Sequence, residues 1–325
     1  MKAILWTQYG APRLLKFGEA QKPIPKDNEV LIKNINATVT PGDCELRRFD
    51  MHVLFWLPLR LYFGLFKPKR PILGMELSGV IEAVGKDVTN FKVGDEVLGG
   101  TGLKFGAYAE YTCLNSTKLI THKPSKISFD YAATLPTGGL NALHYIRKCE
   151  IKPGQSILII GAAGCFGSYA VQLAKYFGAV VTAVDSTEKL DALKTIGADN
   201  VIDFKQEDFR QNGKTYDAIF DVEGKDTILR NIKSLNPKGR YVLATPWIKQ
   251  VAQGKWSNLT SNKKFIYDLA KEDPKALDYL KSLMVDGKIK ALIDRHYPLE
   301  QMAEAQEFVE SGQKVGHVVI NISGQ

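Results

Sequence analysis

The sequence predicts an α/β fold in which a doubly wound parallel sheet follows a β-rich N-terminal part, and three observations lead to this prediction. Glycine and proline interrupt short apolar runs up to about residue 119, which is typical of a bent, barrel-like sheet. From about residue 121, helical and strand patterns alternate, as they do around a parallel sheet. Between residues 156 and 185, a glycine-rich turn joins a strand pattern to a helix pattern. With 325 residues, the chain is long enough for two domains.

The β-rich part begins at the N-terminus. Residues 1–6 are predicted to form the first strand, and no secretory leader is expected there. Residues 30–35 and 79–84 have strand patterns, and residues 94–97 form a turn that leads into a further strand. We therefore expect these short strands to form a barrel-like sheet rather than a parallel one.

Residues 156–185 carry the main functional prediction. An apolar run at 157–160 is followed by Gly161, Gly164 and Gly167, then by a helical pattern, a second apolar run and Asp185. Glycine lets the backbone approach phosphate groups, and N–H groups at a helix start point at the anion, so the turn is predicted to bind a dinucleotide diphosphate. The alternative is a tight turn in an ordinary α/β domain. The residues expected to contact a cofactor here are Gly161, Ala163, Gly164, Cys165, Phe166 and Gly167.

The elements after this unit continue the alternation. Helices are predicted near residues 188–196 and 225–235, and strands at residues 201–204, 218–222 and 241–244. Ligands bind at the carboxyl ends of parallel strands, so Val222 and Thr245, which follow two of these strands, are expected to line the cofactor. The tail is predicted to form helices near residues 273–285 and 299–311 and a last strand at 316–322.

Composition and charge exclude some function classes. The chain is 45% hydrophobic and carries a formal charge of +8, but its basic residues are mixed with acids, which argues against a nucleic-acid surface. The four cysteines are scattered without a C-x-x-C pair, so we expect a reduced, cytoplasmic protein. The five histidines show no spacing typical of metal ligands, and no metal site is expected.

An apolar segment at residues 53–66 stands apart from the rest of the β-rich part. It is shorter than the ~20 residues needed to span a bilayer, and Pro58 and Arg60 interrupt it. Three roles remain open, in this order of preference: a lid over a pocket for a hydrophobic substrate, a subunit contact, and a membrane-surface contact helped by Lys67, Lys69 and Arg70.

Taken together, these motifs resemble the medium-chain dehydrogenase/reductase superfamily, in its zinc-free, quinone-oxidoreductase-like branch. The order and spacing of the motifs carry the resemblance, which covers nearly the whole chain. They are Gly10, residues 36–43 (NATVTPGD), 71–79 (PILGMELSG), 93–97 (VGDEV), 106–111 (GAYAEY), 161–175, 197–199 (GAD) and 316–319 (GHVV).

The resemblance implies an architecture and a domain order. A GroES-like catalytic domain is expected at residues 1–121 and a Rossmann dinucleotide-binding domain at 122–260, with a return to the catalytic domain at 261–325. The fold expected is therefore a Rossmann domain inserted in a GroES-like one. Relatives often pair through the edge of the Rossmann sheet, which implies a homodimer.

Zinc-dependent relatives bind the metal through a Cys-His pair and the histidine of a Gly-His-Glu. Thr40-Pro41 and Met75 stand at the matching positions here, and none of them is a usual zinc ligand. Without a Lewis acid, hydride transfer favours substrates that delocalise negative charge, namely quinones and α,β-unsaturated carbonyls. The alternatives left open are a metal-dependent alcohol dehydrogenase, and a non-catalytic nucleotide-binding or membrane-peripheral protein of the same fold.

Residues near the second strand of the glycine unit give opposite indications about the cofactor, some favouring NAD(H) and others NADP(H). Asp185, as an acid at that strand end, favours NAD(H), because such an acid usually bonds the ribose hydroxyls and repels a 2′-phosphate; its alternative role is a helix N-cap. Ser186 and Lys189 favour NADP(H), and Lys189 matches a lysine of NADPH-using relatives, although Phe204 stands where such relatives often have tyrosine. The resemblance slightly favours NADP(H), and NAD(H) remains the alternative.

Three residues are candidates near the reacting groups. Thr40 matches a position where many relatives have asparagine, and its hydroxyl is one candidate to meet a substrate oxygen. Tyr62, inside the apolar segment, is the candidate proton donor if that segment folds over the pocket. Thr137 matches a family position near the nicotinamide, and its alternative role is helix capping.

Overall fold

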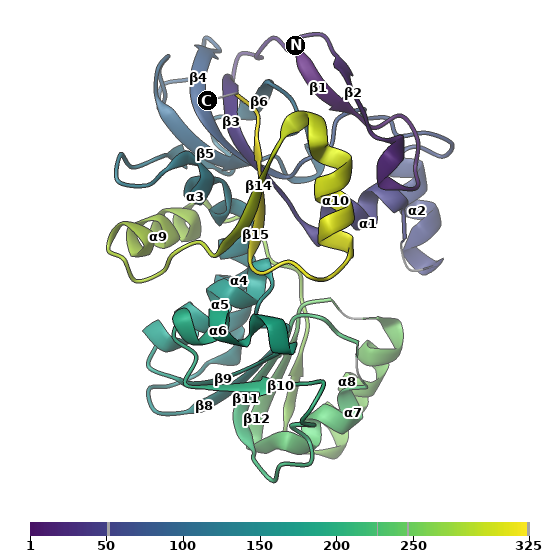
Figure 1. The fold of residues 1–325 in the computed structure, drawn as a ribbon, viewed down its shortest axis with the longest axis vertical. Coiled ribbons are helices and arrows are strands. Elements are labelled where there is room, and N and C mark those ends of the chain that lie inside the picture. Colours follow the sequence, from purple (N-terminus) through teal and green to yellow (C-terminus); the bar gives the residue numbers. More distant parts are fainter. Residues whose placement is uncertain (51–52, 226, 246, 324–325) are drawn as a thin grey trace. The chain divides into compact units, whose positions relative to one another are not determined.

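The computed structural model describes residues 1–50, 53–225, 227–245 and 247–323 and divides the chain into two compact units (Figure 1). The first unit contains residues 1–137, 272–286 and 293–325, and the second contains residues 138–271 and 287–292. The chain thus leaves the first unit, builds the second and returns, as an inserted domain requires. No helix in the described ranges has the length and apolar character needed to cross a membrane.

The first unit is built on a seven-stranded sheet around β3 (Glu29–Val39), whose buried residues place it at the centre of the core. β3 pairs antiparallel with β4, β6 and β15, and only the pair of β14 and β15 is parallel. The other strands of this sheet are β4 (Glu76–Val84), β5 (Glu96–Gly100), β6 (Tyr111–Asn115), β7 (Ile120–His122), β14 (Ile293–Pro298) and β15 (His317–Asn321). β1 (Lys2–Leu5) and β2 (Lys16–Glu19) form a separate antiparallel pair.

Buried apolar side chains such as Trp6, Leu77 and Met302 form the core of the first unit, and the described residues add five α-helices to it. They are α1 (Pro41–Arg48), α2 (Val53–Phe63), α3 (Phe129–Ala133), α9 (Pro274–Val285) and α10 (Met302–Glu310). The buried Arg47 of α1 bonds Gly10 O, Gln306 and Glu310 of α10, so it joins the N-terminal and C-terminal parts of this unit.

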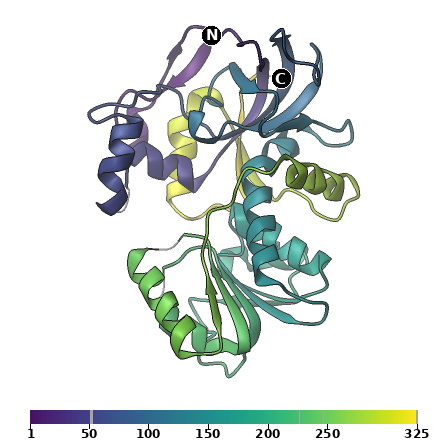
Figure 2. The ribbon, with the colours of Figure 1, turned by 180° about the vertical axis from the view of Figure 1, so that it is seen from behind.

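The second unit is a doubly wound α/β domain with a six-stranded parallel sheet in the order β10-β9-β8-β11-β12-β13. Figure 1 and Figure 2 show the teal helix α5 on one face of this sheet and the light-green helices α7 and α8 on the other. The strands are β8 (Ser156–Ile160), β9 (Val180–Asp185), β10 (Asn200–Asp203), β11 (Tyr216–Asp221), β12 (Leu235–Leu243) and β13 (Lys264–Ile266). The helices are α4 (Leu140–Cys149), α5 (Cys165–Tyr176), α6 (Leu190–Thr195), α7 (Ile228–Asn231) and α8 (Ile248–Thr260).

The unit boundaries lie later in the chain than the sequence predicts. The first falls after residue 137 rather than 121, because α3 packs on β3 and β4 and the Ser78 hydroxyl donates to the Phe129 carbonyl over 2.6 Å. The second falls after residue 271 rather than 260, because β13 adds a sixth strand beside β12. Residues 287–292 return to the second unit, where the Gln172 side chain bonds both backbone groups of Lys290.

Candidate active site

The glycine-rich turn lies between β8 and α5 in the second unit, as the sequence predicts. Gly161 has a positive φ of +73°, and a Cβ there would come within 2.7 Å of the Glu223 side chain. A Cβ on Gly167 would meet Gly161 O at 2.3 Å, so Gly167 allows the helix to pack on the turn. At Gly164, which caps α5, a Cβ would only touch Gly161 O at 3.5 Å, so this side is open. These are the three tasks that a diphosphate-binding turn needs from its glycines.

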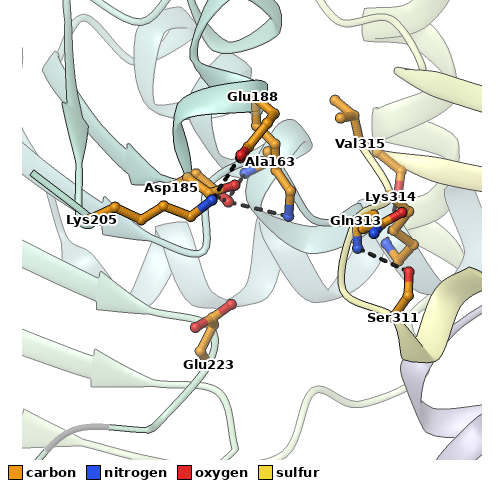
Figure 3. A network of polar contacts seen from close by, with 12 residues as sticks. Ala163, Asp185, Glu188, Lys205, Glu223, Ser311, Gln313, Lys314 and Val315 are labelled. Carbon is orange, nitrogen blue, oxygen red and sulfur yellow. Dashed lines mark hydrogen bonds and ion pairs between the residues drawn. The ribbon is translucent and has the colours of Figure 1, made fainter.

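Asp185 ends β9 and is buried beside the turn. Its Oδ2 accepts the Ala163 N–H over 2.9 Å, its Oδ1 accepts the Ser186 N–H over 2.9 Å, and the ammonium of Lys189 lies 3.2 Å from Oδ1. Figure 3 shows this contact with Ala163, together with the nearby ion pair of Lys205 and Glu188. The alternative that Asp185 caps a helix is wrong. The N-cap residues of the two following helical turns are Ser186 and Lys189, and neither turn has a side-chain capping hydrogen bond.

A cavity of about 270 Å³ opens at the carboxyl ends of β8, β9 and β11, all within the second unit. It is lined by Ile160, Gly161, Val184, Asp185, Phe204, Glu207, Asp208, Phe209, Arg210, Glu223 and Lys225. The two phenylalanines and Val184 offer apolar walls of the kind that an adenine ring uses, and the cavity adjoins the glycine turn. Phe204 thus lies where the sequence predicts a cofactor contact.

The lining of this cavity carries more acids than bases. Asp185, Glu207, Asp208 and Glu223 contribute four carboxylates, against the cations of Arg210 and Lys225. Arg210 pairs with Asp208 at 2.6 Å and Lys225 pairs with Glu223 at 3.0 Å. Asp185 pairs with Lys189, so Glu207 is the one lining carboxylate for which the described residues show no ion pair. A 2′-phosphate entering here would meet this small excess of negative charge, which favours a ligand without it.

Asp221 organises the next edge of the same site, and the sequence prediction missed it. Its Oδ1 accepts the N–H groups of Glu223 and Gly224, and its Oδ2 accepts the Tyr241 hydroxyl over 2.5 Å. Burial raises the pKa of Asp221, while these hydrogen bonds oppose the shift. Its signal in the sequence was an acid at the end of an apolar run, the same signal that Asp185 gave.

The other predicted cofactor residues of the second unit lie around the turn and the strand ends. Cys165 and Phe166 begin α5, with Cys165 buried, and Ser186 is buried directly after Asp185. The carbonyl of Val222 accepts the Thr245 hydroxyl over 3.1 Å, so these two strand ends are joined. The second unit therefore brings the predicted dinucleotide residues to one edge of its sheet.

Two fully buried acids mark the candidate catalytic part of the first unit. Glu76 accepts the Thr38 hydroxyl and, over 2.6 Å, the N–H of Thr137. Asp43 accepts the backbone N–H of Thr40 over 3.0 Å and its hydroxyl over 2.6 Å. Burial raises the pKa of Glu76 to about 7 and that of Asp43 to about 6, although these hydrogen bonds oppose the shift. The sequence analysis includes both acids in its motifs but predicted a role for neither.

The predicted catalytic residues have different surroundings. Thr40 is 3% exposed and caps α1, and its hydroxyl is engaged with Asp43. Tyr62 is 51% exposed on α2, receives a bond of 3.3 Å from Arg70, and lines a separate cavity of about 190 Å³ with Thr101 and Glu272. The described lining of that cavity does not include Thr40. The catalytic roles of Thr40 and Tyr62 therefore stay predictions.

Thr137 lies in the π-helical turn Leu135–Gly139, just before α4. The cap position of α4 is Gly139, so the capping alternative for Thr137 does not hold. Instead, Glu76 holds the backbone of Thr137. Its expected place near a nicotinamide stays a prediction.

The residues present fit a dinucleotide. The turn offers an open approach at Gly164, the first turn of α5 presents N–H groups at its N-terminal end, and the neighbouring cavity suits an adenosine. The described residues include no group of three or more His, Cys, Asp or Glu side chains placed to hold a metal ion. The prediction that the chain carries no zinc stays open to direct measurement.

Comparisons with known proteins agree with this geometry. Residues 26–125 match the family model "Alcohol dehydrogenase GroES-like domain", and residues 196–320 match "Zinc-binding dehydrogenase". The chain belongs to the medium-chain dehydrogenase/reductase superfamily. Within it, the chain belongs to the quinone-oxidoreductase-like branch, as its relatives show.

The relatives cover nearly the whole chain. A 2-methylene-furan-3-one reductase of Solanum lycopersicum is 34% identical over 99% of this chain and 79% of its own. A chloroplastic NADPH-dependent alkenal/one oxidoreductase of Arabidopsis thaliana is 32% identical over 98% of this chain and 79% of its own. The solved quinone oxidoreductase of Coxiella burnetii has a TM-score of 0.89 and 32% identity, covering 99% of both chains.

Proposed function

We propose that this protein is an NAD(P)H-dependent oxidoreductase that reduces a quinone or the activated double bond of an α,β-unsaturated carbonyl. The observation that carries the proposal is the glycine turn with its open approach at Gly164, next to the cavity at the strand ends. The relatives named as reductases of quinones, alkenals and a methylene-furanone support the substrate class.

When bound, the dinucleotide supplies a hydride. The protein's own groups bind and orient. The N–H groups at the start of α5 stabilise the diphosphate charge, and the cavity walls hold the adenosine. In the first unit, Glu76 fixes the backbone of Thr137, so the segment that precedes α4 has a defined position. A substrate that delocalises its own negative charge needs to be positioned by the protein but needs no Lewis acid.

The direct experiment is a turnover assay that follows nicotinamide absorbance. Quinones and enones are offered with NADH or NADPH, and simple ketones and aldehydes serve as controls that cannot delocalise charge. We expect turnover with the first group and much less with the second. Absence of turnover with every quinone and enone would contradict the proposal.

Metal content is tested on the same preparation. We expect protein purified without chelator to contain far less than one zinc per chain, and EDTA to leave turnover unchanged. One tightly held zinc per chain would favour a metal-dependent alcohol dehydrogenase instead.

For the cofactor, we propose a slight preference for NADP(H). A relative named for NADPH dependence supports it, and the acidic lining of the cavity opposes it. The ratio of kcat/KM with NADPH to that with NADH measures the outcome. A ratio above one supports NADP(H), and a ratio below one assigns the preference to NAD(H).

A hydrophobic substrate is proposed from the surface of α2 and the residues after it. Leu57, Leu61 and Leu65 are exposed at a spacing of four, and Phe66 is 90% exposed. Such a surface suits a lid over an apolar substrate, while a homodimer contact and a membrane-surface contact are the other two proposals for it. The basic side chains of Lys69 and Arg70 lie beside it, and they bond Leu61 O and Leu103 O respectively.

A further inference from the structure

Asp185 has contacts that do not match the role predicted from its position. An acid at this strand end is expected to accept the hydroxyl groups of the adenosine ribose. The carboxylate of Asp185 instead faces the glycine turn and the start of the next loop. Its side chain is only 5% exposed, so little of it is available to a ligand.

The N–H groups of the glycine turn are directed inward. Those of Gly161 and Ala162 donate to Val184 O over 3.1 and 3.2 Å, and that of Gly164 donates to Gly161 O over 3.2 Å. The N–H of Ala163 donates to Asp185 Oδ2 over 2.9 Å. A diphosphate must therefore be met by the N–H groups of the first turn of α5, and the shape of the glycine turn decides where these point.

In this set, Asp185 supplies the side-chain acceptor, while the other acceptors are backbone carbonyls. Its bond to Ala163 joins the end of β9 to the middle of the turn. Its second oxygen accepts the Ser186 N–H and lies 3.2 Å from the ammonium of Lys189, whose side chain is 14% exposed. The negative charge is thus balanced inside the protein rather than by a ligand.

We propose that Asp185 is a positioning residue for the diphosphate: it presets the glycine turn through Ala163 and does not bind the adenosine ribose. The inference rests on the proposed function, because it assumes that the site takes a dinucleotide. It predicts a different pattern of losses from that of a ribose ligand, because adenosine carries the ribose but no phosphate.

The test compares the affinities of NADH, ADP and adenosine for the full chain and for Asp185→Ala, by calorimetry or by displacement of NADH. We expect the alanine variant to bind ADP and NADH roughly tenfold more weakly, as loss of a hydrogen bond to a charged group implies, and to bind adenosine unchanged. Asp185→Asn keeps an acceptor for the Ala163 N–H, so it is expected to lose less ADP affinity than the alanine variant.

Asp191→Ala is the matched control, because it removes a carboxylate of the same unit whose side chain is 98% exposed. It is expected to bind all three ligands like the wild type. Thermal unfolding checks that each variant is folded, and if Asp185→Ala is not, Asp185→Asn alone carries the comparison of ADP with adenosine.

Two outcomes would overturn the inference while leaving the proposed function intact. One is an equal loss for adenosine and ADP in either Asp185 variant, which would make Asp185 a ribose ligand. The other is unchanged affinity for all three ligands in both Asp185 variants. Failure of the wild type to bind NADH, NADPH and ADP is a different result, and it would overturn the proposed function itself.

Discussion

Glu76 is a carboxyl group without exposed surface, and its two oxygens receive hydrogen bonds from Thr38 and Thr137. The neighbouring charge of Asp43 adds to the burial that raises its pKa to about 7. Because the pKa of Glu76 differs between the folded and the unfolded state, the free energy of unfolding depends on pH. At the scale of single residues, Glu76 is the clearest feature that the sequence did not reveal.

The raised pKa of Glu76 predicts a pH dependence of stability. Between its unfolded pKa near 4.5 and its folded pKa of about 7, the folded state binds more protons than the unfolded state. The free energy of unfolding should therefore fall as pH rises through this window, by about 1.4 kcal/mol for each unit of pKa difference. The smaller shift of Asp43 contributes in the same direction.

Denaturant unfolding at several pH values between 4.5 and 7.5 measures this effect, with Glu76→Gln as the comparison. The glutamine keeps an acceptor for the Thr137 N–H but does not ionise, so its free energy of unfolding should fall less steeply with pH. An identical pH slope in the two proteins would show that Glu76 does not titrate in this range.

Among the helices and strands, α5 packs tightly on the glycine turn. Gly167→Ala would place a Cβ 2.3 Å from the backbone oxygen of Gly161, which cannot move without breaking the turn. We expect it to lower the free energy of unfolding by about 1–3 kcal/mol, as overpacking does, and to abolish dinucleotide binding. Denaturant unfolding and NADH titration measure the two effects.

Gly164→Ala separates binding from stability at the same element. Its φ of −73° suits any residue, and its Cβ would touch Gly161 O at a permitted 3.5 Å. We expect nearly normal stability but weaker NADH binding, because the Cβ stands on the open approach to α5. Wild-type NADH affinity in Gly164→Ala would show that the bound diphosphate does not lie against Gly164.

The exposed apolar surface of α2 predicts an effect on substrate binding. Leu57→Ser with Leu61→Ser should raise the KM for a long-chain quinone severalfold and leave the KM for the cofactor unchanged, because the lid role concerns the substrate alone. Steady-state kinetics measure this, with Leu229→Ser on α7 as an exposed control. An unchanged KM, together with a lost dimer in gel filtration or lost binding to anionic vesicles, would assign the surface to one of its other two proposed roles.

Secondary structure could be predicted well where local patterns are strong and less well elsewhere. The glycine unit was expected at residues 156–185, and β8, α5 and β9 occupy this range. In contrast, α8 and β13 were missed, and the helix expected at 225–235 is the short α7 followed by a 3-10 turn. The face of α8 carries exposed apolar side chains such as Trp256 and Leu259, so its amphipathic pattern is weak.

At the scale of the whole molecule, the chain ends are joined by Arg47 of α1. Its guanidinium is 1% exposed and bonds Gly10 O, Gln306 and Glu310, so it links segments almost 300 residues apart. Arg47→Met should lower the free energy of unfolding of the first unit by about 3 kcal/mol, because it removes the partner of Gly10 O and of the Gln306 side-chain oxygen and leaves Glu310 paired with Arg48 alone.

Unfolding of this variant is followed with NADH present and absent. Since Arg47 belongs to the first unit, NADH affinity of the second unit should be unchanged at temperatures where the protein is folded. Arg48→Met is the comparison, because Arg48 is 39% exposed and pairs with Glu310 at 3.0 Å. An equal loss of stability in this variant would show that the ion pair with Glu310, rather than the buried bonds to Gly10 O and Gln306, carries the effect.

The sequence by itself determined the superfamily, the glycine turn and the alternation of strands and helices, because these depend on residues close together in the chain. Tertiary structure alone decided what the acids do. Asp185 faces the turn, Asp221 holds the loop after β11, and Glu76 holds Thr137, each through partners 3 to 61 residues away. A carboxyl group at a strand end looks the same in every sequence, and its partners and its burial, which set its charge and its role, exist only once the strands are packed together.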